Sequence, residues 1–134
     1  MTREAYHKAL KELQNELMAM GDMVSNAIRR SIDSLEKRDI EVSKEIIKND
    51  IFINKKRFEI EERCLLLIAT QQPMAVDLRT IAAILSITTD LERIADHAEG
   101  IARINVMVGK ESLVRQLTDI PKMAEKGLSM LSRC

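Results

Sequence analysis

Acidic side chains crowd one stretch of the chain, Thr89–Glu99. Glu92 and Asp96 are four residues apart, so in a helix they lie on one side, and Glu99 lies close to them. Like charges at this spacing oppose helix formation by roughly 0.2–0.5 kcal/mol per pair. A bound cation would relieve the repulsion, because carboxylate oxygens are ligands for hard and borderline metal ions.

A second polar pair, Asp50 and Asn54, interrupts stripes that are otherwise filled by isoleucine and phenylalanine. In antiparallel helices joined near Gln72, Asp50 lies 22 residues before the turn and Ile94 lies 22 residues after it. The two polar pairs therefore lie at the same height and can face one another. The spacing predicts a metal site whose candidate ligands are Asp50, Asn54, Glu92, Asp96 and Glu99.

The same acids can also be interpreted as a solvated helix face. Arg93 and Arg103 lie close enough along the sequence to neutralise them. His97 falls on a different side of the helix from Glu92 and Asp96, so we expect it to be a surface or hydrogen-bonded histidine. Spacing alone leaves both interpretations open.

Long helices must position these residues. In the first helix, apolar residues recur from Tyr6 to Leu35 at alternating steps of four and three. Asp39 is a suitable N-cap for the second helix, and Pro73 ends it. The expected helices cover about 3–35, 40–70 and 74–108, with a short fourth helix from about 119. On the third helix we expect an apolar face made of Ile84, Ile87, Leu91, Ile94, Ala98, Ile101 and Val108.

Short connections between long helices favour antiparallel neighbours. The sequence therefore predicts an all-α fold, an antiparallel three-helix bundle of long helices with a short C-terminal fourth helix. Residues 121–131 echo residues 21–31, which indicates a repeat. We expect a first repeat at 1–110, a connector at 111–118 and the start of a truncated second repeat at 119–134. The apolar face of the short fourth helix must pack somewhere, so a homodimer or higher oligomer is expected.

Composition narrows the function classes. The chain has 21 basic and 21 acidic residues, which argues against nucleic-acid binding. Its longest apolar runs, such as Cys64–Ala69, fall short of the roughly 18 residues of a membrane span, and the N-terminus lacks a signal-peptide core. A cytoplasmic protein is expected. The sequence has no Gly-rich phosphate loop or zinc-type Cys/His cluster, so we do not expect the protein to be an enzyme.

Four segments carry a family resemblance. "DLERIADHAEGIA" (Asp90–Ala102) closely resembles the signature of the PhoU family of phosphate-uptake regulators. "QQPMAVDLRTI" (Gln71–Ile81), "NDIFIN" (Asn49–Asn54) and "MGDMV" (Met20–Val24) resemble other segments of the family in the same order. At Ala95 the family usually has glycine, so close backbone packing there could be altered.

The resemblance implies a tandem of two three-helix bundles, each with an E(D)xxxD motif that can bind metal clusters, often of iron or zinc. Here the motif is Glu92–Asp96, and Asp50 and Asn54 resemble the matching pair on the second helix. It also implies a negative regulator of phosphate uptake and of phosphate-starvation signalling. The implied partners are the ATPase of a phosphate ABC transporter and a PhoR-type sensor kinase, so the protein would reach the membrane only through its partners.

Other function classes remain as alternatives. One is a helical-bundle adaptor without a regulatory role, with or without metal. Another is a ferritin-like di-iron carboxylate protein, a fold that takes Glu-x-x-His from each of two helices. That motif occurs here once, at Glu4–His7.

Overall fold

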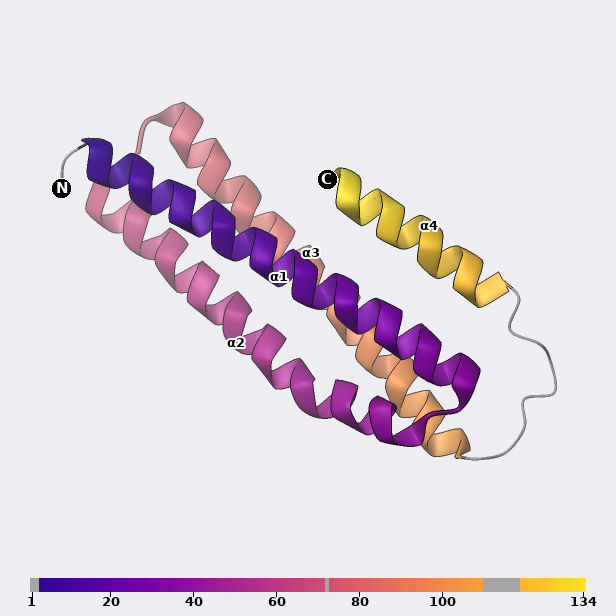
Figure 1. Ribbon diagram of the computed structural model, residues 1–134. Coiled ribbons are helices and arrows are strands. Elements are labelled where there is room, and N and C mark those ends of the chain that lie inside the picture. Colours follow the sequence, from indigo (N-terminus) through magenta and orange to yellow (C-terminus); the bar gives the residue numbers. More distant parts are fainter. Residues whose placement is uncertain (1–2, 72, 110–118) are drawn as a thin grey trace.

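The computed structural model describes residues 3–71, 73–109 and 119–134 of the chain. The described residues form four helices and no strand: α1 (Arg3–Lys37), α2 (Ile40–Gln71), α3 (Ala75–Val108) and α4 (Asp119–Arg133). The first three are long, run antiparallel and pack against one another as a bundle (Figure 1). The all-α prediction is confirmed. The predicted connector, 111–118, lies outside the described residues.

The heptad-like stripe of α1 forms one side of the core. Leu13, Met20 and Val24 are almost fully buried, and they pack with residues such as Ile60 of α2 and Ile81 of α3. Because α-helical residues three and four apart share a face, this regular spacing keeps one side of α1 against its neighbours over its whole length.

Two turns connect the bundle. Between α1 and α2, the Asp39 side chain accepts a hydrogen bond from the Val42 backbone N–H (3.2 Å), as expected of an N-cap. Arg38, just before it, adopts a left-handed φ of 55°. Between α2 and α3, Pro73 lies in the break, and α3 starts at Ala75.

A buried polar network ties the first turn to the end of α3. Asn105 donates from its amide nitrogen to the Ser34 carbonyl oxygen (3.0 Å) and to Ser43 Oγ (2.8 Å). Its amide oxygen accepts from the Arg38 guanidinium (2.7 Å), which also donates to the Gly109 carbonyl oxygen. These bonds offset the cost of a left-handed, non-glycine Arg38, about 1–2 kcal/mol.

The buried face of α3 differs from the predicted one. Ile84, Leu91 and Ala98 are buried as expected, but Ile87 is 41% exposed. The face is turned by about 60° toward Ala95 and Ala102, at ~100° per residue. These small side chains face the core, whereas the larger Ile94 and Ile101 line a surface groove of about 570 Å³.

Helix α4 contacts α1 and lies on the side of α1 away from α2 (Figure 1). Leu131 packs against the bundle core, and Ile120 and Ala124 border the same groove as Ile94. The apolar face of α4 is therefore partly covered within one chain. None of the described helices is both long and apolar enough to cross a membrane.

Candidate metal centre

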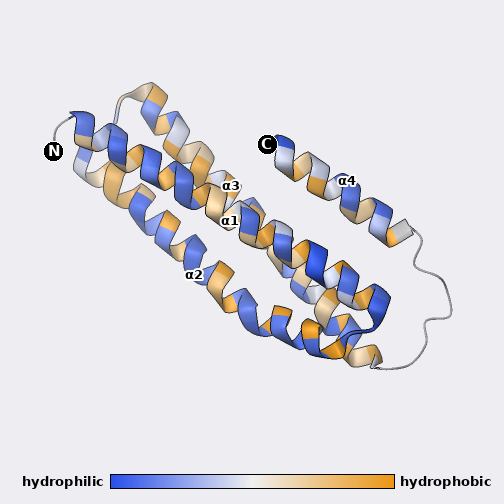
Figure 2. Ribbon diagram, in the orientation of Figure 1, coloured by the Kyte–Doolittle hydropathy of each residue, from blue (hydrophilic) through white to orange (hydrophobic). Residues whose placement is uncertain are grey.

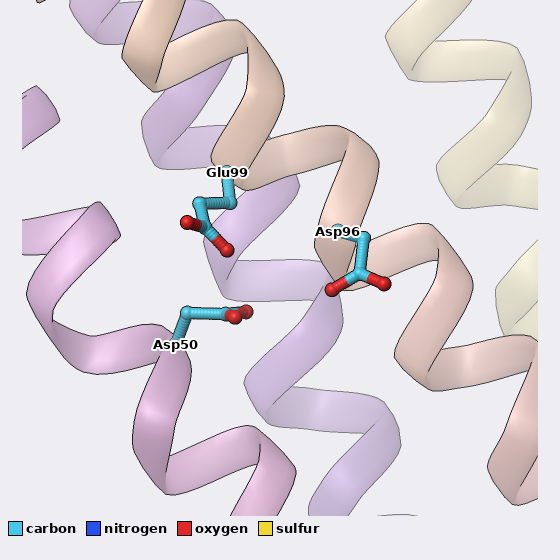
Figure 3. Close-up of side chains that lie close together, drawn as sticks. All are labelled: Asp50, Asp96 and Glu99. Carbon is cyan, nitrogen blue, oxygen red and sulfur yellow. The ribbon is translucent and has the colours of Figure 1, made fainter.

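Three carboxyl groups meet between α2 and α3. Asp50 extends from α2, and Asp96 and Glu99 extend from α3, with one oxygen from each lying within 4.8 Å of the others. Figure 3 shows Asp50 and Glu99 reaching into the space between the two helices, with the Asp96 carboxyl beside them. Asp50 is buried, Glu99 is half-buried and Asp96 is exposed, so the cluster lies at the surface of the bundle.

Burial and mutual repulsion shift the proton affinities of the cluster. Burial, followed by the hydrogen bond and the charge of Glu99, raises the pKa of Asp50 to about 7. Burial alone would raise the pKa of Glu99, but its hydrogen bond with Asp50 and its contacts with Arg103 lower it. The metal-free pair therefore holds one proton, which belongs mainly to Asp50 and is lost near neutral pH.

The third carboxyl group is perturbed in the same direction. Partial burial raises the pKa of Asp96, and the charges of Glu92 and Glu99 add to the effect. Arg57 and His97 act in the opposite direction without cancelling it. The cluster is thus short of positive charge, which a bound cation would supply.

Glu92 does not belong to the cluster. Its carboxylate accepts a hydrogen bond at 2.5 Å from the guanidinium of Arg57 on α2, and both side chains are mostly buried. Arg57 is held further by the Glu61 carboxylate at 3.8 Å and by the ring of Phe58, whose centroid is 4.6 Å away. The structure therefore does not place Glu92 beside Asp50 as expected. The Glu92 carboxylate is instead held in an ion pair with the long side chain of Arg57.

Asn54 lies beside the cluster. Its amide nitrogen donates to the Asp50 carboxylate at 3.3 Å. Its amide oxygen is buried and has no hydrogen-bond partner among the described residues. An unpaired buried oxygen costs about 1–3 kcal/mol, and a cation within its reach would offset that cost. Asn54 thus fits a metal-binding role as an oxygen donor.

The donor set has a clear chemical preference. It consists of carboxylate oxygens and one amide oxygen, which are suitable ligands for magnesium, calcium, manganese or iron. Zinc sites in proteins more typically contain nitrogen and sulfur ligands. Two oxygens on opposite sides of one transition-metal ion are at most about 4.4 Å apart, close to the 4.8 Å span observed. The cluster can therefore hold an ion after small side-chain movements.

The positions of the residues around the cluster agree only in part with those predicted from the sequence. Arg103 pairs with Glu99, with its Nε donating at 2.7 Å, so local neutralisation of one acid is confirmed. His97 is exposed and outside the carboxylate cluster, as expected. The pairing of Arg57 with Glu92 was missed, although Arg57 interrupts the same apolar stripe as Asp50.

Comparisons with known proteins identify the family of the chain. Residues 17–104 match the PhoU domain family. The chain is 39% identical over 132 residues to a phosphate-specific transport system accessory protein PhoU homolog from Clostridium acetobutylicum, covering 98% of this chain and 60% of the relative. The chain thus spans less than two thirds of the length of that relative.

Solved structures show the same fold. The PhoU crystal structure from Pseudomonas aeruginosa superimposes with a TM-score of 0.90 at 27% identity, covering 95% of this chain and 61% of that one. The phosphate transport system regulatory protein PhoU from Streptococcus pneumoniae gives a TM-score of 0.86 at 31% identity, covering 95% and 59%. Sequence and structure together show that this chain belongs to the PhoU family.

Proposed function

We propose that this chain acts in phosphate transport as a negative regulator of phosphate uptake and of phosphate-starvation signalling. The observation that carries the proposal is the meeting of Asp50, Asp96 and Glu99 in a chain of the PhoU family. Relatives of this chain are named phosphate-specific transport system accessory proteins, which supports a role beside a phosphate transporter. The proposed role is binding in the cytoplasm, without catalysis.

The proposal includes a transition-metal ion or cluster, of iron or zinc, and the oxygen-only donor set fits iron better than zinc. Asp50, Asp96 and Glu99 would hold it, with the Asn54 amide oxygen as a further ligand. Glu92 could join only after leaving Arg57. When bound, the metal would neutralise the carboxylates and tie α2 to α3.

The proposed partners are the ATPase of a phosphate ABC transporter and a PhoR-type sensor kinase. A metal that ties α2 to α3 would hold the surface around the cluster in one arrangement, which lowers the entropy cost of binding a partner. Residues 1–110 would supply one complete repeat for this surface. Residues 119–134 would begin a second repeat, in line with the echo between residues 21–31 and 121–131.

Binding of the purified chain to the transporter ATPase and to the sensor kinase of its own organism tests this proposal. We expect iron-loaded wild type to bind at least one of them, and Asp96→Asn to bind it more weakly. Asp90→Asn is the matched control, because Asp90 is an exposed acid on the same helix and the substitution changes the net charge equally. Absence of binding to both partners, or equal binding by the two variants, would contradict the proposal.

A further inference from the structure

The outer face of α2 is unusually apolar for an exposed surface. Large side chains on it are exposed by 58–66%, and the group comprises Ile51, Phe52, Phe58, Leu65 and Leu66. Figure 2 shows apolar segments recurring along α2, which lies on the side of the bundle away from α4. Such continuous apolar patches on soluble proteins commonly mark interaction sites. We call this set, together with Lys55, Glu59 and Glu62, the α2 stripe.

The α2 stripe is symmetric about its middle. Residues seven apart lie in nearly the same direction on a helix, so the stripe consists of parallel rows. One row is Ile51, Phe58 and Leu65, and Phe52 and Leu66 flank the other side. Between them lies a central row of opposite charges, Lys55 and Glu62. When two copies of this helix lie antiparallel, apolar residues of one therefore face apolar residues of the other, and Lys55 of one faces Glu62 of the other.

The two central charges are free to pair with another molecule. Lys55 and Glu62 are both exposed, and neither forms a salt bridge within the described parts of the chain. Their neighbours differ, since Lys56 pairs with Glu16 of α1 and Arg57 pairs with Glu92 of α3. Among the described residues, Lys55 and Glu62 are thus left without a salt bridge in the middle of an apolar face.

We propose that the α2 stripe binds the α2 stripe of a second copy of this chain in antiparallel orientation. A two-fold axis near Phe58 would place Ile51 opposite Leu65 of the second copy and form two Lys55–Glu62 pairs. The parallel alignment would instead bring Lys55 onto Lys55 and Glu62 onto Glu62, which repel. The charges therefore favour the antiparallel over the parallel direction of the two helices.

Glu59 is the residue that opposes this arrangement. It lies at the edge of the stripe near the proposed two-fold axis, so it would approach Glu59 of the second copy. Replacing it with a neutral residue should strengthen the association. This interface lies on the outer side of α2, and the proposal needs no metal, so it goes beyond the proposed function and stands independently of it.

Sedimentation equilibrium with metal chelated tests the proposal, in a Cys134→Ser background because Cys134 is an exposed free thiol. We expect wild type to dimerise, and Lys55→Glu or Glu62→Lys to raise the dissociation constant at least about tenfold. The double variant Lys55→Glu/Glu62→Lys should return to within a few-fold of wild type. Glu59→Gln should dimerise more tightly. Because the substituted side chains are exposed, the variants should keep wild-type helix content by circular dichroism.

Mixing the two single variants gives the sharpest result. One carries two acids and the other two lysines at the central row, so they should form a heterodimer although each self-associates weakly. A monomeric wild type would overturn the proposal. A dimer whose dissociation constant is unchanged by both charge reversals would also overturn it, and would indicate an interface on another face, such as α4.

Discussion

Replacing Asp50 with asparagine should stabilise the metal-free protein at neutral and alkaline pH. The folded chain raises the pKa of Asp50 from 3.8 to about 7, chiefly because the carboxyl group is buried. The unfolded chain releases this proton near pH 4, so the native state loses stability as pH rises from about 4 to 7. The asparagine side chain would resemble the protonated form of Asp50, and its amide can still donate to Glu99.

The magnitude follows from the size of this shift. Moving a pKa from 3.8 to about 7 corresponds to about 4 kcal/mol, at 1.36 kcal/mol per pH unit. Water reaches the cluster from the exposed Asp96 side and screens the interaction, so we expect a gain of about 1–2 kcal/mol. For a chain of this size that is about 3–8 °C in Tm.

Thermal unfolding followed by circular dichroism, with metal chelated, measures this effect. Asp50→Asn should melt about 3–8 °C above wild type at pH 8, and most of the difference should vanish at pH 4.5. Asp90→Asn, an exposed substitution with the same change in charge, should show little difference at either pH. A gain of equal size at both pH values, or a loss of stability at pH 8, would refute the reasoning.

Three other substitutions test the remaining contacts. Arg57→Gln leaves the mostly buried Glu92 unpaired, so it should lower the free energy of unfolding of the metal-free protein, measured in urea, by about 1–2 kcal/mol. Adding iron should increase the free energy of unfolding more in this variant than in wild type. Asn105→Ala should cost about 2–3 kcal/mol in the same assay, because it removes three buried hydrogen bonds, those to Arg38, to the Ser34 carbonyl oxygen and to Ser43. Gly21→Ala should add about 0.5–1 kcal/mol, since nothing lies within 4 Å of the added Cβ in mid-helix.

The helices and their order could be predicted because their signals are local. The stripe from Tyr6 to Leu35, the Asp39 cap and the break at Pro73 each depend on residues a few positions apart. Counting outward from the α2–α3 turn was enough to bring Asp50 to the height of the α3 acids. The hydrophobic periodicity did not predict which face of α3 is buried. Ala95 and Ala102 lie on that face, and because they are small, their burial depends on how closely the helices approach one another.

The membership of the cluster could be predicted only in part. Spacing places Glu92, Asp96 and Glu99 on neighbouring sides of α3, but it does not say which of them a basic side chain reaches. Arg57 and Glu92 are 35 residues apart, and their pairing depends on the reach and rotamer of Arg57. The buried network around Asn105 was missed for a similar reason, because its partners lie 62 to 71 residues away.

The metal content of the purified chain tests the central claim most directly. The chain would be equilibrated with iron(II) without oxygen, freed of unbound metal and measured by elemental analysis. We expect wild type and Asp90→Asn to retain at least one iron per chain, and Asp50→Asn/Asp96→Asn to retain none while remaining helical. A wild type without iron, or a double variant that keeps the wild-type amount, would show that these carboxylates do not form a metal site.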